Sequence, residues 1–435
     1  MKLLVAGAAG FIGSHIATAL QARGHEVIAA ARSWRSARTR LPALDWIPCD
    51  FTTDKTADWT GRLEGVNAVI NCVGVLQNGL NENSRAVHVD GLTELIEACQ
   101  KTGVARFVHI SAVGAVSASG STYAADKEAG EQLVLDAGQG DALDSVVLRP
   151  SLVVGRNSYG GTSLIRALAG LPWITPVVGG EQVFRPIAVD DVVDAVEQCC
   201  RPGSPAGVRW DLSGPERINL ADILVAYRRW LGFGETRLVK VPRWMARPAF
   251  LFGDMLGWLG IKTAMRTNSL KQLDFDVEGD PQPWLEATGA KPRGFTDFLN
   301  ASPAGAQDRW FARLGFARPL ARVLLAAFWL VTGILSLTIA RSEALFILER
   351  GGFSPEMQQI VLWGGSIFDM IVGAAMLLKR HVRMAAWLMA TMTIAYLTAI
   401  TISLPGLWSG ALGPALKSVP LIGMALMIAA TEDER

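Results

Sequence analysis

Three glycines near the N-terminus constrain the fold of this chain more than any other feature. The glycines, Gly7, Gly10 and Gly13, follow a short apolar run over Leu3–Ala6, and a helical pattern continues over Ser14–Arg23. A strand that turns into a helix through glycines presents backbone N–H groups at the positive end of the helix, where an anionic group can approach. A glycine turn without a ligand would leave the same pattern, but this placement favours a dinucleotide pyrophosphate.

Each residue of the turn has an expected part in such a site. Gly7 permits the tight turn, Gly10 the close approach of the phosphates, and Gly13 the close packing of helix on strand. We place Phe11 and Ile12, which lie between the last two glycines, in the same cofactor-binding turn.

The hydrophobic residues, half of the chain, are unevenly distributed. Residues 1–300 read as a soluble domain, whereas nearly every segment past Pro319 is apolar. A net charge of +1 argues against a nucleic-acid partner, which would require a basic face. The five cysteines all precede residue 201 and lack the spacing of metal ligands, so we expect reduced thiols and no metal site.

Apolar runs alternate with helical patterns through the first half, which predicts a doubly wound parallel sheet of the Rossmann type with helices on both faces. From Ser151 the pattern loosens, as is typical of a substrate lobe, with short helices at Asp190–Cys200 and Asn219–Leu231. We expect one domain over 1–300, with lobe elements at about 151–300. The expected strands are Lys2–Ala6, Glu26–Ala31, Asp45–Pro48, Ala68–Cys72, Arg106–Ile110 and Ser145–Leu148, and the clearest helices are Ser84–Thr102 and Tyr123–Asp136.

The segment Val241–Gly260 is apolar and aromatic, with Arg243 and Arg247 at its start. It fits an amphipathic helix on a membrane surface and, equally, a lobe helix packed on the sheet domain. The sequence leaves both interpretations open.

Four apolar stretches follow a linker expected over 301–318, and each is long enough to cross a bilayer. Basic residues precede the first stretch and fill the turn over 379–383, so the positive-inside rule puts the N-terminal domain and the C-terminal tail in the cytoplasm. A buried soluble bundle is the alternative, against which these flanks argue. We expect a four-helix transmembrane domain over 319–435 in the inner (cytoplasmic) membrane, with spans at about Leu320–Ala340, Ile360–Leu378, Met384–Leu404 and Ala411–Thr431.

Residues after the next strands bear on the choice of cofactor. No acid follows the second expected strand, where a carboxylate would bind the ribose hydroxyls of NAD; Arg32 is there instead and can clamp a 2′-phosphate. NADP is therefore favoured over NAD, although a solvated basic loop is the alternative. Asp50, after the third strand, can accept from the adenine amino group. Val73 and Gly74 follow the fourth strand, where a glycine lets the backbone lie against the cofactor.

Tyr123 and Lys127, four residues apart on an expected helix, form the second informative element. A phenol is a poor acid or base near neutral pH, and an adjacent ammonium stabilises its phenolate and lowers its pKa. Lys127 can also hold the nicotinamide ribose. A solvated helix start is the alternative, but the pair follows the fifth strand, where this architecture places a catalytic pair.

Together these motifs resemble the short-chain dehydrogenase/reductase superfamily, in its extended or atypical branch, over residues 1–300. The runs Leu148–Gly155 and Phe184–Asp191 add to the resemblance. The chain is similar to the Rossmann-like accessory subunit of respiratory complex I and to NmrA-like proteins, some of which bind cofactor without turnover. From about Arg318 it resembles the DoxX-like four-helix membrane proteins.

The resemblance implies roles for particular residues. Tyr123 would be the catalytic acid or base, Lys127 its partner, and Ser111 the residue that orients the substrate carbonyl. Pro150, after the sixth strand, would join the cofactor site. Ala112 aligns with the serine position nearly as well as Ser111, and other candidates for that role are Ser117, Ser119 and Ser121.

Two ionisable residues, Asp369 and Lys417, lie inside the second and fourth apolar stretches. Such residues are costly in a bilayer and are usually paired or functional. A structural ion pair and a functional pair carry equal weight here, and a proton or quinone site is a further option.

The sequence favours a membrane-anchored NADP-dependent oxidoreductase that transfers a hydride to or from a carbonyl or hydroxyl carbon. The membrane domain suggests an apolar substrate such as a lipid, isoprenoid or quinone, with membrane lipid as a partner and a membrane complex or homo-oligomer left open. One alternative is an NADPH-binding structural or redox-sensing subunit without turnover, and another is an epimerase or dehydratase. A further one makes the membrane domain the functional part.

Overall fold

A computed structural model of the chain describes residues 1–74, 83–113, 122–140, 142–258, 267, 270, 276–409 and 413–432. Contacts divide it into two compact units, one of Met1–Asp254 with Ala264–Ala312 and one of Met255–Thr263 with Arg313–Arg435. Each unit has a hydrophobic core of its own.

Seven parallel strands form the sheet of the first unit, in the order β11-β6-β5-β4-β1-β2-β3. Chain order reverses between β1 and β4, which is the doubly wound arrangement that opens a crevice at the carboxyl ends of these strands. The fold class is therefore as predicted, and the six expected strands are confirmed to within two residues. The strands are β1 Lys2–Ala6, β2 Glu26–Ala31, β3 Asp45–Pro48, β4 Ala68–Asn71, β5 Arg106–Ile110, β6 Asp144–Pro150 and β11 Val208–Leu212.

The seventh strand, β11, lies where we expected only lobe elements, so that expectation is wrong. Trp210 and Leu212 are buried, while Arg209 and Asp211 alternate with them. This is the pattern of a half-buried strand at a sheet edge. Because the strand is short, its sequence is hard to distinguish from that of the surrounding loops.

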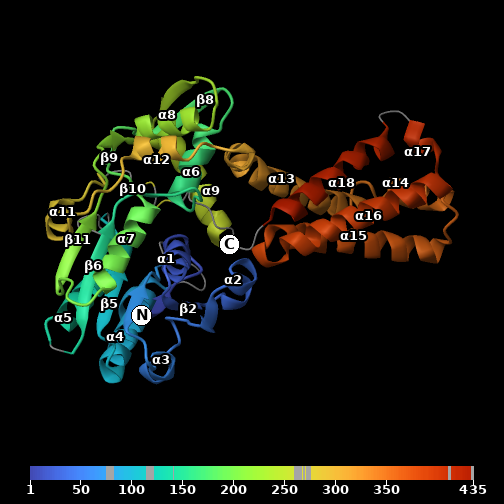
Figure 1. The fold of residues 1–435 in the computed structure, drawn as a ribbon. Helices are drawn as coiled ribbons and strands as arrows, with labels where there is room; N and C mark the ends of the chain where they lie inside the picture. The colour runs from blue at the N-terminus through green and yellow to red at the C-terminus, as the bar shows by residue number, and fades with distance from the viewer. Residues whose placement is uncertain are drawn as a thin grey trace. The chain divides into compact units, whose positions relative to one another are not determined.

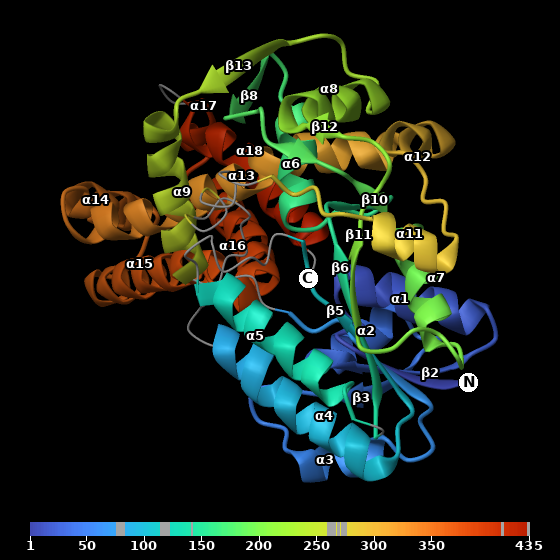
Figure 2. The same cartoon turned by 90° about the vertical axis from the view of Figure 1, so that its left-hand side faces the viewer.

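Helices cover both faces of the sheet (Figure 1), with α3, α4 and α5 on one face and α1 and α7 on the other (Figure 2). Alternation along β1 explains the two layers: Leu3 and Val5 pack with α1 and α7. Leu4 and Ala6 pack with α3, α4 and α5. The helices are α1 Phe11–Ala22, α2 Trp34–Arg40, α3 Thr56–Arg62, the π-helix Ala86–Asp90, α4 Gly91–Thr102, α5 Thr122–Ala137 and α7 Val189–Cys200.

The lobe has a separate core around Ile223, Tyr227 and Phe295. The helix expected over Asn219–Leu231 is confirmed as α8, whereas that over Asp190–Cys200, α7, packs on the sheet. The lobe helices are α6 Gly161–Ala169, α8 Leu220–Trp230, α11 Gln282–Thr288, which packs on β11, and α12 Phe295–Ala301. The short strands are β7 Val153–Val154, β8 Ile174–Val178, β9 Val183–Phe184, β10 Ile187–Ala188, β12 Ile218–Asn219 and β13 Arg237–Val241.

The segment with two open interpretations forms helix α9, Arg243–Trp258, as both of them expect. It packs through Ala246 and Phe250, which are 7% exposed. On its other side Trp244 is 75% and Phe252 48% exposed. An apolar surface remains uncovered along one side of this helix.

The second unit is helical. Among the described residues, three helices are long and apolar enough to cross a membrane: α13, α15 and the helix over Lys379–Ser403. The fourth expected span corresponds to α18, which is apolar but shorter. Residues 306–318, expected as a linker, are helical, because few residues before Pro319 disfavour a helix. The helices are α13 Ala306–Leu337, α14 Arg341–Arg350, α15 Pro355–Leu377, α16 Val382–Ser403, α17 Gly406–Ser409 and α18 Pro414–Thr431, with a 3₁₀ turn at Lys379–His381.

The two ionisable residues of the apolar stretches do not meet as expected. Asp369 of α15 accepts a hydrogen bond from the Tyr396 hydroxyl of α16 at 3.2 Å. Lys417 is exposed in the first turn of α18. The pairing of Asp369 with Lys417 is therefore wrong; the tyrosine takes the place of the lysine.

Candidate active site

The glycine turn is closely packed against the end of β4. Gly7 has φ of +80°, and a Cβ there would lie 2.8 Å from the backbone carbon of Cys72 and the nitrogen of Val73. A Cβ at Gly13 would overlap the carbonyl oxygen of Gly7. The turn and packing roles expected for these two glycines are thus the roles that the geometry gives them.

The same turn has the features of an anion cradle. Helix α1 begins at Phe11 with Gly10 as N-cap, no side chain caps it, and its first turn holds no acid. The first N–H groups of a helix have no partner within the helix, so those of Phe11 and Ile12 suit an anionic group. A Cβ at Gly10 would come 3.2 Å from the Gly7 oxygen. These residues fit the pyrophosphate of a dinucleotide.

Arg32 and Asp50 follow β2 and β3, at the edge of the sheet formed by the carboxyl ends of its parallel strands. Arg32 is exposed and lies one residue beyond β2, whose Ala30 carbonyl accepts from the Gly7 N–H at 2.9 Å. The Asp50 carboxylate accepts from the backbone and the hydroxyl of Thr52 at 3.0 and 2.7 Å. That carboxylate therefore holds its own turn, and its contact with adenine stays a prediction.

Buried polar residues end β4 and β5. Asn71 Nδ2 donates to His109 Nδ1 at 3.1 Å, and Asn71 Oδ1 accepts from the Val73 N–H at 3.0 Å. Burial, together with Lys127, holds the pKa of His109 well below its usual value, so its ring is neutral. His109 Nε2 is buried without a hydrogen-bond partner in the described part of the chain.

Lys127 and Tyr123 lie on one face of α5. Lys127 is 5% exposed, and its Nζ donates to the Ile110 carbonyl at 3.5 Å. Burial lowers its pKa to about 8. The Tyr123 ring packs edge to face on His88 at 5.7 Å, and burial raises its pKa to about 12. The expected lowering of the tyrosine pKa is wrong for this structure, because burial of the phenol raises it.

Ser111 does not face outward from β5. It is 4% exposed, and its hydroxyl donates to the Glu131 carboxylate of α5. The segment that follows is tied to β6, since the Val113 N–H donates to the Pro150 carbonyl at 3.1 Å. Ser117, Ser119 and Ser121 lie outside the described residues.

Two series of contacts bring the glycine turn and helix α5 to one edge of the sheet. Gly7 packs on Cys72, whose thiol interacts electrostatically with Lys127. A Cβ at Gly74 would lie 3.4 Å from the His88 ring, which in turn packs on Tyr123. The structure thus gathers the expected glycines, Gly74, Tyr123 and Lys127 around the ends of β1, β4 and β5.

Three buried residues of this site were not predicted from the sequence: Asn71, His109 and Glu131. Asn71 and His109 are polar residues at or near the carboxyl ends of largely apolar strands, a signal that the sequence did contain. Glu131 follows Lys127 by four residues, the same helical spacing that separates Tyr123 from Lys127. No metal-ligand cluster occurs among the residues that the structure describes.

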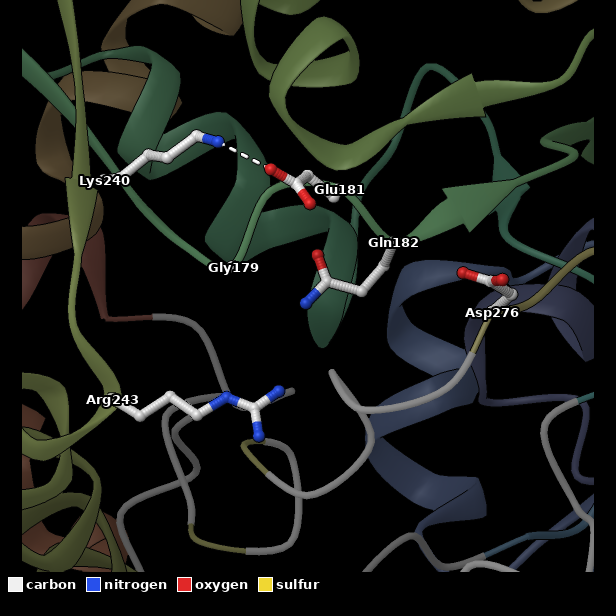
Figure 3. A pocket seen from close by; sticks show the side chains of 6 residues that line it. All are labelled: Gly179, Glu181, Gln182, Lys240, Arg243 and Asp276. Carbon is white, nitrogen blue, oxygen red and sulfur yellow. Dashed lines mark hydrogen bonds and ion pairs between the residues drawn. The ribbon is translucent and has the colours of Figure 1, made fainter.

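A hollow of about 460 Å³ lies in the lobe (Figure 3). Its lining is mainly polar and charged, and Lys240 Nζ contacts Glu181 Oε1 at 2.7 Å. None of the expected catalytic residues lines it. The lining residues are Gly179, Glu181, Gln182, Lys240, Arg243 and Asp276.

Residues 3–205 match the NAD dependent epimerase/dehydratase family, and residues 326–426 match the DoxX-like family. The NADH-ubiquinone oxidoreductase 40 kDa subunit of Neurospora crassa is 26% identical over 299 residues, which are 68% of this chain and 76% of that protein. Ceramide reductase of Caulobacter vibrioides is 27% identical over 203 residues, 45% of this chain and 60% of that protein. Sterol demethylase protein B of Methylococcus capsulatus is 27% identical over 277 residues, 58% of this chain and 81% of that protein.

Solved structures share the fold of the first unit. MoeE5 in complex with UDP-glucuronic acid and NAD has a TM-score of 0.53 and 21% identity, covering 73% of this chain and 100% of that one. UDP-glucose 4-epimerase of Thermus thermophilus, in complex with NAD, has a TM-score of 0.51 and 23% identity, covering 69% and 100%. The chain thus joins an N-terminal region that matches the NAD dependent epimerase/dehydratase family to a C-terminal region that matches the DoxX-like family.

Proposed function

We propose that the N-terminal domain is an NADP-dependent oxidoreductase that acts on a carbonyl or hydroxyl carbon of an apolar substrate. The observation that carries the proposal is the convergence of the glycine turn with Tyr123 and Lys127 at one sheet edge, through Cys72 on one side and His88 on the other. An anion cradle and a proton-transfer group side by side are what hydride transfer to a carbonyl requires.

The chain's own residues would manage the proton and the charge. The bound nicotinamide would supply or take the hydride. With a pKa of about 12, the Tyr123 phenol carries its proton at neutral pH and can donate it to a substrate oxygen. Lys127, whose pKa is about 8, is mostly charged at neutral pH, and its ammonium on the same helix face favours the phenolate once the proton has left.

NADP rather than NAD is proposed from Arg32. Arg32 lies one residue beyond β2, the strand whose Ala30 carbonyl bonds the Gly7 N–H of the glycine turn, and the adenosine ribose would lie at this strand end. A guanidinium makes paired, charge-assisted hydrogen bonds to a phosphate. The solved relatives above contain NAD, so Arg32 alone supports this preference.

An apolar substrate and anchoring in a membrane have independent support. Among the residues that the structure describes, three helices are long and apolar enough to cross a bilayer, and α9 exposes Trp244 and Phe252. Two relatives are named for lipids, a ceramide reductase and a sterol demethylase protein. The proposed orientation, with the N-terminal domain on the cytoplasmic side of the inner membrane, rests on the basic turn at 379–383.

A second candidate is a cofactor-holding subunit of a membrane complex, without turnover. The hydrogen bond of Ser111 to Glu131 favours it, because that serine is not free to donate to a substrate carbonyl. The relative from Neurospora crassa, named as a subunit of NADH-ubiquinone oxidoreductase, agrees with it.

Replacing Tyr123 with Phe separates the two candidates. For the enzyme, turnover of NADPH with long-chain ketones, or of NADP⁺ with long-chain alcohols, falls about 10²–10⁴-fold while NADPH affinity is kept. The matched control is Tyr159→Phe, at an exposed tyrosine of the lobe, which keeps full turnover. Unaltered turnover in Tyr123→Phe would refute the enzyme, and NADPH binding without turnover in the unmodified protein would favour the subunit.

A further inference from the structure

Glu131 is a buried acid on α5, next to the residues of the candidate active site. It lies on α5 four residues beyond Lys127 and is 1% exposed. One carboxylate oxygen accepts the Ser111 hydroxyl, and the other lies 3.9 Å from an Arg149 nitrogen of β6 and 3.6 Å from an Arg209 nitrogen of β11. A buried carboxylate held from three strands has little freedom to move.

The charges around Glu131 form a closed network. Arg149, which faces it from β6, also contacts Asp211 of β11 at 2.7 Å. Burial raises the pKa of Glu131, whereas the Ser111 hydroxyl, the two arginines and Lys127 favour its charged form. Removal of its charge alone would take from the buried Lys127 the carboxylate that most favours its ammonium form.

Lys127 is the group of the proposed reaction that Glu131 acts on most directly. Burial disfavours the lysine ammonium, while Glu131 and the Cys72 thiol favour it. The His109 ring, whose charge is also coupled to that of Lys127, is buried and neutral. The carboxylate therefore supports the positive charge on which both ribose binding and the phenolate would depend.

The hydrogen bond to Glu131 fixes the direction of the Ser111 hydroxyl hydrogen. Because its hydroxyl hydrogen points to Glu131, only the oxygen lone pairs are left for any group on its other side. A substrate hydroxyl can donate to such an oxygen, whereas a substrate carbonyl cannot accept from it.

We propose that Glu131 is a positioning residue of the reaction, which fixes Ser111 as a hydrogen-bond acceptor and stabilises the Lys127 ammonium, so that the site prefers the hydroxyl form of its substrate. The inference rests on the proposed oxidoreductase function. It adds to that function a preference for the hydroxyl form of the substrate over the carbonyl form.

Glu131→Gln in the full chain, purified in mild detergent, tests the charge. The pH midpoint above which NADPH binding weakens, read from NADPH fluorescence, moves down by about one unit, because Lys127 loses its counter-charge. Glu131→Asp, which keeps the charge, brings the midpoint back toward that of the unmodified protein. An unchanged midpoint in Glu131→Gln overturns the stabilising role.

Ser111→Ala tests the hydrogen bond without removing the charge. The unmodified protein with NADP binds a long-chain alcohol more tightly than the matching ketone, and Ser111→Ala lowers that ratio about tenfold with the pH midpoint unmoved. A ratio unaffected by both Ser111→Ala and Glu131→Gln overturns the acceptor role.

The two proposals fail in different ways. NADPH binding without turnover in the unmodified protein refutes the oxidoreductase, while the pH midpoints still decide whether Glu131 supports the lysine charge. If the unmodified protein binds no NADPH, both proposals fall.

Discussion

In the first unit, charged side chains are buried at or near the sheet and share several partners, as Lys127, Glu131 and Arg149 do. In the second unit, outward side chains are largely apolar: Ile371 is 62% exposed and Ile394 51%. Its buried Arg322 donates to the carbonyls of Met376 and Leu377 at 2.7 and 2.8 Å, at the end of α15. This contrast supports the proposal that the second unit is anchored in a membrane.

The largest effect is expected at the closely packed glycine turn of the first unit. Gly7→Ala adds left-handed strain of about 1–2 kcal/mol and a clash with the Cys72 backbone worth about 1–3 kcal/mol, so we expect a loss of about 4 kcal/mol. The loss is measured by urea unfolding in detergent, with hydrogen exchange of the backbone amides in β1 and β4 as the readout. Gly24→Ala is the control: its φ is +88° but no atom lies within 4 Å of the added Cβ. Equal losses for the two variants would contradict the close packing.

The buried lysine gives the first unit a pH dependence. In the folded state the Lys127 pKa falls from 10.5 to about 8, so the unfolded chain binds more protons between these values. Stability therefore rises between pH 8 and 10.5, by about 3 kcal/mol from this group. Lys127→Met removes this rise from the unfolding curve, whereas Lys101→Met, at an exposed lysine, keeps it. Parallel curves for Lys127→Met and the unmodified protein would disprove the burial of the charge.

A buried charge of the second unit, that of Arg322, should matter less, because it bonds to two neutral carbonyls and makes only a long ion pair with Glu432, at 3.6 Å. Arg322 is 5% exposed, and Arg322→Met leaves two helix-end carbonyls without their donor, at a cost of about 2 kcal/mol. Thermal unfolding in detergent measures it. Arg380→Met, at an exposed arginine of the turn, is the control and should change little. A similar loss in both variants would remove the contrast between buried and exposed arginines.

The smallest effect concerns an exposed charge of the first unit. Arg32→Ser is expected to weaken NADPH binding about tenfold, or about 1.4 kcal/mol, and to leave NADH binding unchanged. Titration by cofactor fluorescence measures both. Arg38→Ser, on the exposed side of α2, should alter neither affinity. A parallel loss for NADPH and NADH would show that Arg32 does not select the 2′-phosphate.

The pattern of apolar residues alone was enough to predict six strands of the sheet, since short apolar runs between helical patterns have few other interpretations. It was not enough for β11, whose alternating polar residues are common to edge strands and loops. Pattern placed Tyr123 and Lys127 on one helix face, but it gave the wrong direction for the tyrosine pKa. The reason is that burial depends on what packs over the ring, here His88.

By itself, the sequence determined the order of strands, glycine turn and helices, the apolar C-terminal part and the placement of Tyr123 and Lys127 on one helix face, because these follow from local spacing and period. Only the tertiary structure decided which polar residues meet: Ser111 with Glu131, Asn71 with His109, Asp369 with Tyr396. Partners that are far apart in the chain leave no periodic signal, and their contact depends on the register and packing of whole elements.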